Sequence, residues 1–340
     1  MIQFNRPFAA PAALYLLMSG LVGCASGSLG KISSMPDLPK EVSSDKDRFE
    51  VKEVVGSPSP VPSPTPNPVL SKKSRKKKKS ARPTPTLSGE PVLVPTEAFP
   101  VRRPAKEPIW VGEKLTYEIT YFGMSAGDFD LEVMPFKAID NRKVYHVQGT
   151  AISSKVFSLF YRLNDMVESF IDFDGVFSHR FHIVLDESKQ TRDSLELNDS
   201  SKAQTFYWNR WNHKDRGYTE NKDFTPMPRF PQDSLSALYY LRTLPLNDGD
   251  VVTFPVVSEG KNWEAVVSVL RREVMSTPMG KIRCIVLKPE TKYQGVLQKK
   301  GDSFIWLTDD DRKYLVRLEA KVRIGTVVGA LKKAVPGTPP

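Results

Sequence analysis

The sequence predicts an all-β protein, mainly antiparallel, that forms a large curved sheet, a partial barrel or a sandwich with one or two short helices. Two observations predict this class: apolar and polar residues alternate along many short segments of the C-terminal two thirds, and turn-forming residues separate these segments. A third observation is the abundance of proline, serine and lysine before the first such segment. We therefore expect a disordered tether over residues 24–109, a β domain over 110–335 and a flexible tail at 336–340.

The alternation is clearest over residues 114–121, 128–133 and 314–324. In each segment every second side chain is apolar, as in a strand with one buried and one solvated face. Turn signals such as Asp174-Gly175 separate several of the segments. Further strands are expected at 143–152, 163–173, 176–186, 191–197, 203–210, 250–257, 262–274, 281–288 and 302–308.

Two short helices are expected among the strands. Asp233 is a suitable N-cap, apolar residues follow it at helical spacing, and the helix should end by Pro245. A shorter helix is expected over 154–160. A single helix beside a large sheet either closes the core or covers a ligand cavity, and the sequence leaves both alternatives open.

The first residues have the layout of a cleaved export signal. Arg6 supplies a positive charge, the apolar run 8–22 is too short to span a bilayer, and small residues precede Cys24. The end of this run, LVGC at 21–24, resembles the lipobox of bacterial lipoproteins. The resemblance implies that residues 1–23 are removed and that Cys24 is acylated, with palmitate among the chains, so membrane lipid is a partner. The residue after Cys24 is alanine rather than aspartate, which implies sorting to the outer membrane, on its periplasmic side.

The predicted tether is rich in proline. Residues 25–109 contain 15 prolines, and proline occupies every second position of 58–68. Such a segment lacks the N–H donors that helices and sheets need, and few large apolar residues accompany it, so it should be extended and solvated. A spacer of this length would carry the β domain far from the lipid surface.

The net charge of +10 is concentrated in this region. Residues 1–109 contain 17 Lys and Arg against 9 Asp and Glu, which leaves 32 against 30 for residues 110–340. Behind an export signal, a basic run does not indicate nucleic acid as a partner. It indicates either contact with anionic envelope material or a solvated, self-repelling spacer. The residues of this run are Lys72, Lys73, Arg75, Lys76, Lys77, Lys78 and Lys79.

Sequence motifs predict no catalytic residue, no metal site and no cofactor. The stretch GMSAG at 123–127 matches the nucleophile elbow of α/β-hydrolases, which requires a helix after the serine. Alternating strands flank this stretch on both sides, so its glycines predict a hairpin turn instead. The histidines lack the spacing of metal ligands and are expected to be solvated or hydrogen-bonded. They are His146, His179, His182 and His213.

Carboxylates and the second cysteine add no predicted site. Asp165 and Glu168 alternate across a strand, and the acids at 309–311 lack the spacing of a calcium loop. Cys284 lies in an apolar run and has no partner once Cys24 is acylated. We therefore expect no disulfide and a buried, unreactive thiol at position 284.

Three blocks of the domain resemble the bacterial domain-of-unknown-function 3108 family. They are GEKLTY at 112–117 with its continuation to 127, QDSLSALYYLR at 232–242, and FIWLTDDDR at 304–312 with its continuation to 325. The resemblance implies an exported bacterial protein without an agreed activity. By topology alone the domain is also similar to periplasmic lipoprotein carriers, in which a concave sheet holds acyl chains under a helix.

Aromatic side chains are the remaining candidates for a binding site. The segment 206–213 concentrates aromatic and basic residues, and in a strand Tyr207 and Trp208 point to opposite faces. At least one ring then leaves the core face unless both faces are covered. Such a ring can stack on a sugar, a lipid headgroup or a partner chain, and the alternative is that these aromatic residues build the core of the sheet. The predicted ligand-binding residues are Trp208, Trp211, Tyr239 and Arg242.

The sequence therefore favours a membrane-anchored periplasmic lipoprotein whose β domain binds an amphipathic envelope ligand or a protein partner and is not an enzyme. Two alternatives stay open. One is an envelope enzyme acting on glycan or lipid, whose catalytic groups meet only in three dimensions. The other is a structural tether that joins the outer membrane to the cell wall through the basic run.

Overall fold

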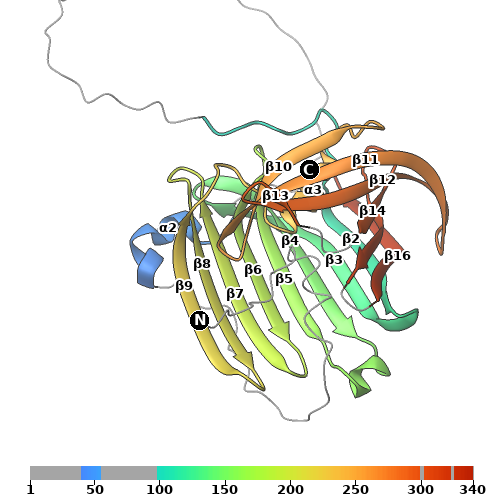
Figure 1. Ribbon diagram of the computed structural model, residues 1–340. Helices are drawn as coiled ribbons and strands as arrows, with labels where there is room; N and C mark the ends of the chain where they lie inside the picture. The colour runs from blue at the N-terminus through green and yellow to red at the C-terminus, as the bar shows by residue number, and fades with distance from the viewer. Residues whose placement is uncertain (1–39, 55–97, 299–301, 323–324, 340) are drawn as a thin grey trace, which may run out of the picture.

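A computed structural model describes residues 40–54, 98–298, 302–322 and 325–339. It contains one 16-stranded sheet in the order β10-β11-β12-β14-β15-β16-β2-β3-β4-β5-β6-β7-β8-β9, with β1 paired to β3 and β13 paired to β12. The sheet curves strongly, so that the β10–β12 arm crosses above the β2–β9 wall (Figure 1). Every pair along the path is antiparallel, which confirms the predicted fold class as an open, curved sheet.

The strands and helices are defined by the following bounds. The strands are β1 Lys52–Glu53, β2 Val111–Tyr121, β3 Met124–Ile139, β4 Arg142–Ser153, β5 Asn164–Asp172, β6 Ser178–Asp186, β7 Gln190–Asp199, β8 Gln204–His213, β9 Gly217–Pro226, β10 Val251–Ser258, β11 Lys261–Thr277, β12 Gly280–Tyr293, β13 Val296–Leu297, β14 Ser303–Thr308, β15 Leu315–Lys321 and β16 Thr326–Thr338. The helices are η1 Lys40–Asp45, α2 Lys46–Phe49, η2 Phe157–Leu159 and α3 Ser236–Arg242. Among the described residues, the longest helix has 7 residues, and none is long and apolar enough to cross a bilayer.

Four strands lie outside the predicted segments: β1, β9, β13 and β16. β9 is polar and exposed along nearly its whole length, and backbone pairing with β8 holds it at the sheet edge. Because it buries neither face, its sequence carries no alternation. β16 continues to Thr338, and its last residues pair with Glu113 and Val111 of β2. The predicted flexible tail is therefore wrong for residues 336–338, since these pairs order them.

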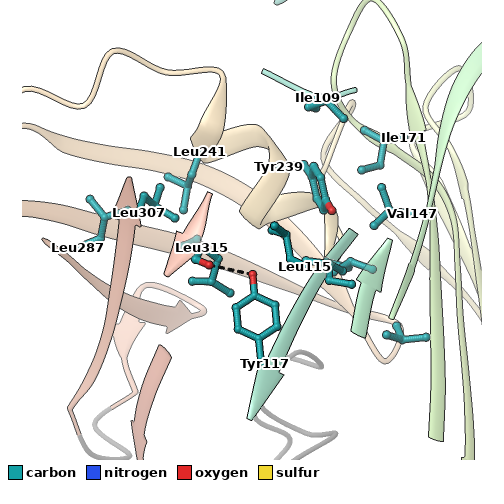
Figure 2. Packing of buried hydrophobic residues seen from close by; sticks show 14 of the residues in the cluster. Ile109, Leu115, Tyr117, Val147, Ile171, Tyr239, Leu241, Leu287, Leu307 and Leu315 are labelled. Carbon is teal, nitrogen blue, oxygen red and sulfur yellow. Dashed lines mark hydrogen bonds between the residues drawn. The ribbon is translucent and has the colours of Figure 1, made fainter. Parts of the chain in front are cut away.

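The core lies on the inner face of the sheet, which we define as the face turned toward α3 and the β10–β12 arm. Leu115 and Tyr117 of β2 and Leu241 of α3 belong to this cluster (Figure 2). Tyr239 on α3 is completely buried within it. Of the two alternatives for the helix, the structure thus shows the one in which it closes the core.

Capping by Asp233 starts the turn that leads into α3, as the sequence predicts. Its Oδ1 accepts hydrogen bonds from the backbone N–H groups of Leu235 and Ser236, at 2.7 and 2.6 Å, and its backbone carbonyl accepts one from Ala237. Regular helix begins at Ser236, later than the predicted start. The side chain of Asp233 is fully buried, and its Oδ2 accepts a hydrogen bond from Ser169 of β5 at 2.6 Å, which ties α3 to the wall.

An N-terminal strap, which we define as residues 40–54, lies on the outer face of the sheet. Val42 and Phe49 are buried there against Leu195, Leu197 and Phe206. The end of the strap forms β1, which pairs with residues 137–138 of β3. The strap therefore crosses from β8 to β3 and packs as part of the domain.

Ion pairs hold the strap in addition to its apolar side chains. Arg48 pairs with the buried carboxylate of Asp199, with Nη1 and Oδ2 at 2.9 Å. Lys202 pairs with Asp45 at 2.6 Å, and Lys222 pairs with Glu41 of the strap at 3.1 Å. The prediction of a disordered tether over the whole of 24–109 is therefore wrong for the strap, because these contacts order it.

Residues 98–109 are a second part of the predicted tether that packs on the domain. The ring of Phe99 stacks on Phe177 with a centroid distance of 6.0 Å, and Ile109 is completely buried. The ordered domain therefore begins near residue 98 rather than at 110, and it includes the strap as well.

Candidate functional site

A cluster of exposed apolar side chains lies where the β2–β3 and β4–β5 connections meet. We call this cluster the apolar end. The exposed fractions of its side chains range from 57% for Ile152 to 82% for Leu159. Soluble proteins rarely leave several large apolar side chains together in water unless the surface binds something. The members of the apolar end are Phe122, Met124, Ile152, Val156, Leu159 and Phe160.

Strand pairing brings the two connections together. Gly127 of β3 pairs with Ser153 of β4, so the chain leaving β4 passes beside the β2–β3 turn. Ser154 then donates a backbone hydrogen bond to the carbonyl of Ala126 at 2.8 Å. A Cβ atom at Gly127 would lie 2.2 Å from the carbonyl oxygen of Ile152, so only glycine permits this approach.

The β2–β3 turn has two residues and presents Phe122 to solvent. Phe122 and Gly123 have φ angles of 51° and 73°, which is the pattern of a type I′ hairpin turn. Asparagine or glycine normally occupies the position of Phe122, because a bulky residue in the left-handed region is strained. The Phe122 ring packs edge-on against Tyr121 with a centroid distance of 4.4 Å, yet 58% of the residue stays exposed at this strained position, which points to a role at the surface.

The β4–β5 connection places one apolar side chain against the core and leaves others exposed to solvent. Its centre is the 3₁₀ turn η2, in which side chains three residues apart point the same way. Val156 and Leu159 therefore project together into solvent, and Phe160 is also exposed. Phe157 instead packs against the core and anchors the connection.

Hydrogen bonds fix the connection in this arrangement. The Ser153 hydroxyl lies 2.7 Å from the hydroxyl of Ser158 and accepts a hydrogen bond from the backbone of Leu163 at 2.9 Å. Arg162 forms a bidentate pair with Asp186 of β6, at 3.1 and 2.9 Å. The exposed apolar side chains thus stand on a connection whose backbone is held at both ends.

A buried pair of acids lies directly behind the connection. Asp165 and Glu187 are both 2% exposed, and the hydroxyl of Tyr161 donates to Glu187 Oε2 at 2.6 Å. Gln190 donates to the same oxygen at 2.6 Å. Burial and then the charge of Glu187 raise the pKa of Asp165 to about 9, so Asp165 carries a proton at neutral pH.

The four predicted ligand-binding residues do not form one site. Trp208 of β8 pairs with Leu195 and packs against the strap on the outer face of the sheet. Trp211, three residues later in the same strand, points to the opposite face. The indole of Trp211 donates to Gln190, beside the buried acids, at 2.7 Å. Tyr239 and Arg242 are buried in the core. Their assignment as ligand residues is therefore wrong, since neither faces solvent.

The side chain of Arg242 instead forms a buried ion pair with Glu113. Its Nη1 and Nη2 atoms lie 2.6 and 2.7 Å from the two carboxylate oxygens. Arg312 pairs with Glu113 Oε2 at 2.7 Å, and the carbonyl of Pro108 accepts a hydrogen bond from each arginine. Glu113, Arg242 and Arg312 come from the sequence blocks at 112–127, 232–242 and 304–325. The three blocks therefore contact one another at this ion pair, which stabilises the fold.

The remaining candidate groups are engaged within the domain. His179 lies 3.0 Å from Asp172, and His182 lies 2.8 Å from Asp193. Ser125 belongs to strand β3, so no helix follows it as a nucleophile elbow requires. Within the described ranges, no group of three or more His, Cys, Asp and Glu side chains is placed to hold a metal ion. Cys284 is buried, as predicted.

Two of the predicted sites lie outside the described residues. They are the acylation site Cys24 and the basic run Lys72, Lys73, Arg75, Lys76, Lys77, Lys78 and Lys79. The apolar end was not predicted from the sequence. Two signals in the sequence indicate it. One is an apolar residue before the glycine of a two-residue turn, and the other is the presence of apolar residues in a predicted connection.

Comparison with known proteins identifies the family. The model described as "Protein of unknown function (DUF3108)" matches residues 116–332. The chain belongs to the DUF3108 family. The matched region covers the sheet from β2 to β16, including α3 and both connections of the apolar end. No curated protein matches this DUF3108 chain.

Three solved structures are similar to the DUF3108 chain at low identity. A β-barrel-like protein of the domain of unknown function DUF1849 from Brucella abortus has 11% identity and a TM-score of 0.44, over 66% of this chain and 98% of that one. A candidate lipoprotein from Parabacteroides distasonis has 10% identity and a TM-score of 0.30, over 70% and 100% of the two chains. A candidate exported protein with a YmcC-like fold from Bacteroides fragilis has 11% identity and a TM-score of 0.31, over 67% and 97%.

Proposed function

We propose that this protein is a lipoprotein of the bacterial cell envelope, anchored in the outer membrane through acylated Cys24, whose β domain is a non-enzymatic binding module. The domain binds an amphipathic envelope ligand or a protein partner through the apolar end. The observation that carries this proposal is the exposure of six large apolar side chains on two hydrogen-bonded connections and the strand ends beside them. These side chains leave water only when something binds there.

The inner face of the sheet is a poor candidate for the ligand site. In lipoprotein carriers the concave sheet holds acyl chains under a helix, but here α3 fills that position with its own side chains. Tyr239 and Leu241 of α3, and Leu235 immediately before it, all belong to the core cluster. Binding is therefore assigned to the end of the sheet rather than to its concave face.

The enzyme alternative has less support. The strongest acidic pair, Asp165 and Glu187, is buried, and Tyr161 and Gln190 satisfy Glu187 by hydrogen bonding. These contacts hold the β4–β5 connection in place, which is a structural role. The structural-tether alternative depends on the basic run at 72–79, and deletion of that run with an assay of cell-wall association tests it.

Site-specific photo-crosslinking in a Gram-negative host tests the proposal with the full chain. A photo-reactive amino acid replaces Leu159 of the apolar end or, as a matched control, Val251 of β10, whose exposed fraction is 62%. We expect an adduct with an envelope lipid, glycan or protein at position 159 and none at position 251. Mass spectrometry identifies the adduct. Absence of any adduct at position 159 would contradict binding at the apolar end.

The anchor is tested separately by metabolic labelling with a palmitate analogue. The wild-type chain should incorporate the label, and the Cys24→Ser variant should not. Separation of the membranes by density should place the labelled protein in the outer-membrane fraction. Label in the Cys24→Ser variant, or a wild-type chain that stays unlabelled, would contradict the assigned anchor.

A further inference from the structure

We propose that the apolar end inserts into the same lipid leaflet that holds the acyl chains of Cys24, so the occupant of this surface is the bilayer itself. This inference rests on the proposed function, because it takes acylation of Cys24 as given. It is carried by three observations: the short chain between the anchor and the strap, the charge around the apolar end, and the satisfied backbone of the β4–β5 connection.

The strap limits the distance between the domain and the membrane. Since the strap packs on the sheet from Lys40 onward, only sixteen residue steps separate Cys24 from the ordered domain. A chain of this length spans at most about 55 Å when fully extended. The domain therefore stays close to the leaflet, in contrast to the long spacer that the sequence predicts.

The same length is sufficient for the apolar end to reach the leaflet. The strap contacts the β7–β8 turn through Lys202, and the apolar end lies at the other end of the strands. Strand β4, with 12 residues, spans about 40 Å between the two ends. Because the available chain exceeds this length, the acyl chains and the apolar end reach one bilayer surface together. Tethering at this distance also raises the effective concentration of lipid at the surface.

The charge around the apolar end is favourable for an anionic leaflet. The connections 154–163, 187–189 and 214–216 at this end contain five basic and two acidic residues. Glu187 and the Nζ of Lys214 are buried, and Arg162 is paired with Asp186, so the remaining bases Lys155, Lys189 and Arg216 face the single acid Asp215. The connections 140–141, 173–177 and 200–203 at the opposite end contain one basic and two acidic residues. Basic residues beside inserted apolar side chains attract anionic headgroups.

The backbone of the β4–β5 connection is suited to a lipid environment. Ser158 and Tyr161 donate their N–H groups to the carbonyls of Ser154 and Phe157, both at 2.8 Å. Leu159 and Phe160 donate to Val156 and Phe157, at 3.2 and 2.9 Å. An inserted segment must satisfy its own N–H groups because hydrocarbon offers no partner. The connection therefore offers Leu159 and Phe160 to lipid with their own N–H groups paired.

Depth-dependent fluorescence quenching tests the insertion with the full, lipidated chain. A Leu159→Cys variant labelled with an environment-sensitive dye is reconstituted into phosphatidylethanolamine–phosphatidylglycerol vesicles, and Val251→Cys is the matched control. Labelling is selective because Cys24 is acylated and Cys284 is buried, and burial raises the pKa of the Cys284 thiol to about 11. Lipids with spin labels at different acyl positions then report the depth of the dye.

Insertion predicts blue-shifted emission from position 159 and strongest quenching about 5–10 Å below the headgroup boundary. Position 251 should emit as in water. Water-like emission from position 159 in acylated protein would overturn the inference and leave the anchor intact. A crosslink from position 159 to an envelope protein, together with no insertion, would overturn it in favour of a protein partner while the proposed binding function stands.

A second variant separates insertion from effects on folding. Leu159→Asp with Phe160→Asp places charges on side chains that are already exposed, so the fold should be unaffected by circular dichroism. With a dye at Met124→Cys, this variant should lose the blue shift that the parent shows. A blue shift that persists in the charged variant would overturn the assignment of the β4–β5 connection as the inserting element.

Discussion

Arg242 and Glu113 form a bidentate ion pair in the core although 129 residues separate them in the chain, and both are 1% exposed. Arg312 adds a second guanidinium to the same carboxylate, at 2.7 Å. Backbone carbonyls accept the remaining hydrogen bonds of both arginines, among them Pro336 in β16. This network joins α3, the start of β2 and the last strand, so it ties the helix to the middle of the sheet, where β16 pairs with β2.

Removal of one partner should destabilise the domain strongly. In Arg242→Met the carboxylate of Glu113 stays buried with half of its charge partners missing, and breaking a buried pair typically costs about 3–5 kcal/mol. Arg271→Met is the matched control, because Arg271 is half exposed and pairs only with Glu273 in the described part of the chain. Its expected effect is below about 1 kcal/mol. Urea unfolding followed by tryptophan fluorescence measures both, and equal effects would contradict the role of the network.

Stability should fall as pH rises because of Asp165. An aspartate has a pKa of about 3.9 in the unfolded chain, whereas burial and Glu187 raise the folded value to about 9. The folded protein then binds one more proton than the unfolded chain between these values, so stability is highest below the unfolded pKa. It decreases by at most about 1.4 kcal/mol per pH unit until the folded pKa is passed.

Asp165→Asn should remove this contribution. Asparagine keeps an acceptor for the backbone N–H of Asp186, which lies 3.0 Å from Asp165 Oδ1, and carries no proton equilibrium. The slope of unfolding free energy between pH 5 and 8 should therefore decrease, while Glu196, whose pKa burial raises to about 8, keeps part of it. Asp215→Asn, at an exposed turn, is the control. An unchanged slope in Asp165→Asn would show that Asp165 is ionised in the folded state.

The strap should be able to detach from the sheet without unfolding of the whole domain. Phe49→Ala removes a side chain that is 6% exposed and packs on β7 and β8, at a typical cost of about 3 kcal/mol. Hydrogen exchange at residues 52–53 should then accelerate by about a hundredfold. Exchange in β4 to β7 should stay slow. Equal acceleration in both regions would show that the strap and the sheet unfold as one unit.

The β2–β3 turn should become more stable when Phe122 is replaced. Phe122→Asn places a preferred residue at a φ of 51° and should relieve about 1 kcal/mol of backbone strain. The gain is reduced by the contact that the Phe122 ring makes over Gly325. Thermal unfolding measures the net change, with Phe122→Ala as the comparison, because alanine removes the ring without relieving the strain. Phe122→Asn should exceed Phe122→Ala in melting temperature.

The sequence by itself determined the fold class and most of the strands, because alternation along a strand records which face is buried. It also determined the cap at Asp233 and the burial of Cys284, since both depend on neighbours within a few residues. β9 escaped prediction because an edge strand is held by backbone hydrogen bonds, which any sequence supplies.

Only the tertiary structure determines which residues are buried and which form the candidate site. Arginine is a residue type that often binds ligands, but Arg242 lies in the core because it forms an ion pair with Glu113, which is far away in the chain. The strap is polar and short of apolar residues, and it orders only because Val42 and Phe49 find a cluster on β7 and β8. The apolar end arises in the same way, since strand pairing brings two separate turns together into one surface. Contacts between distant segments leave no local pattern, so only the folded chain reveals them.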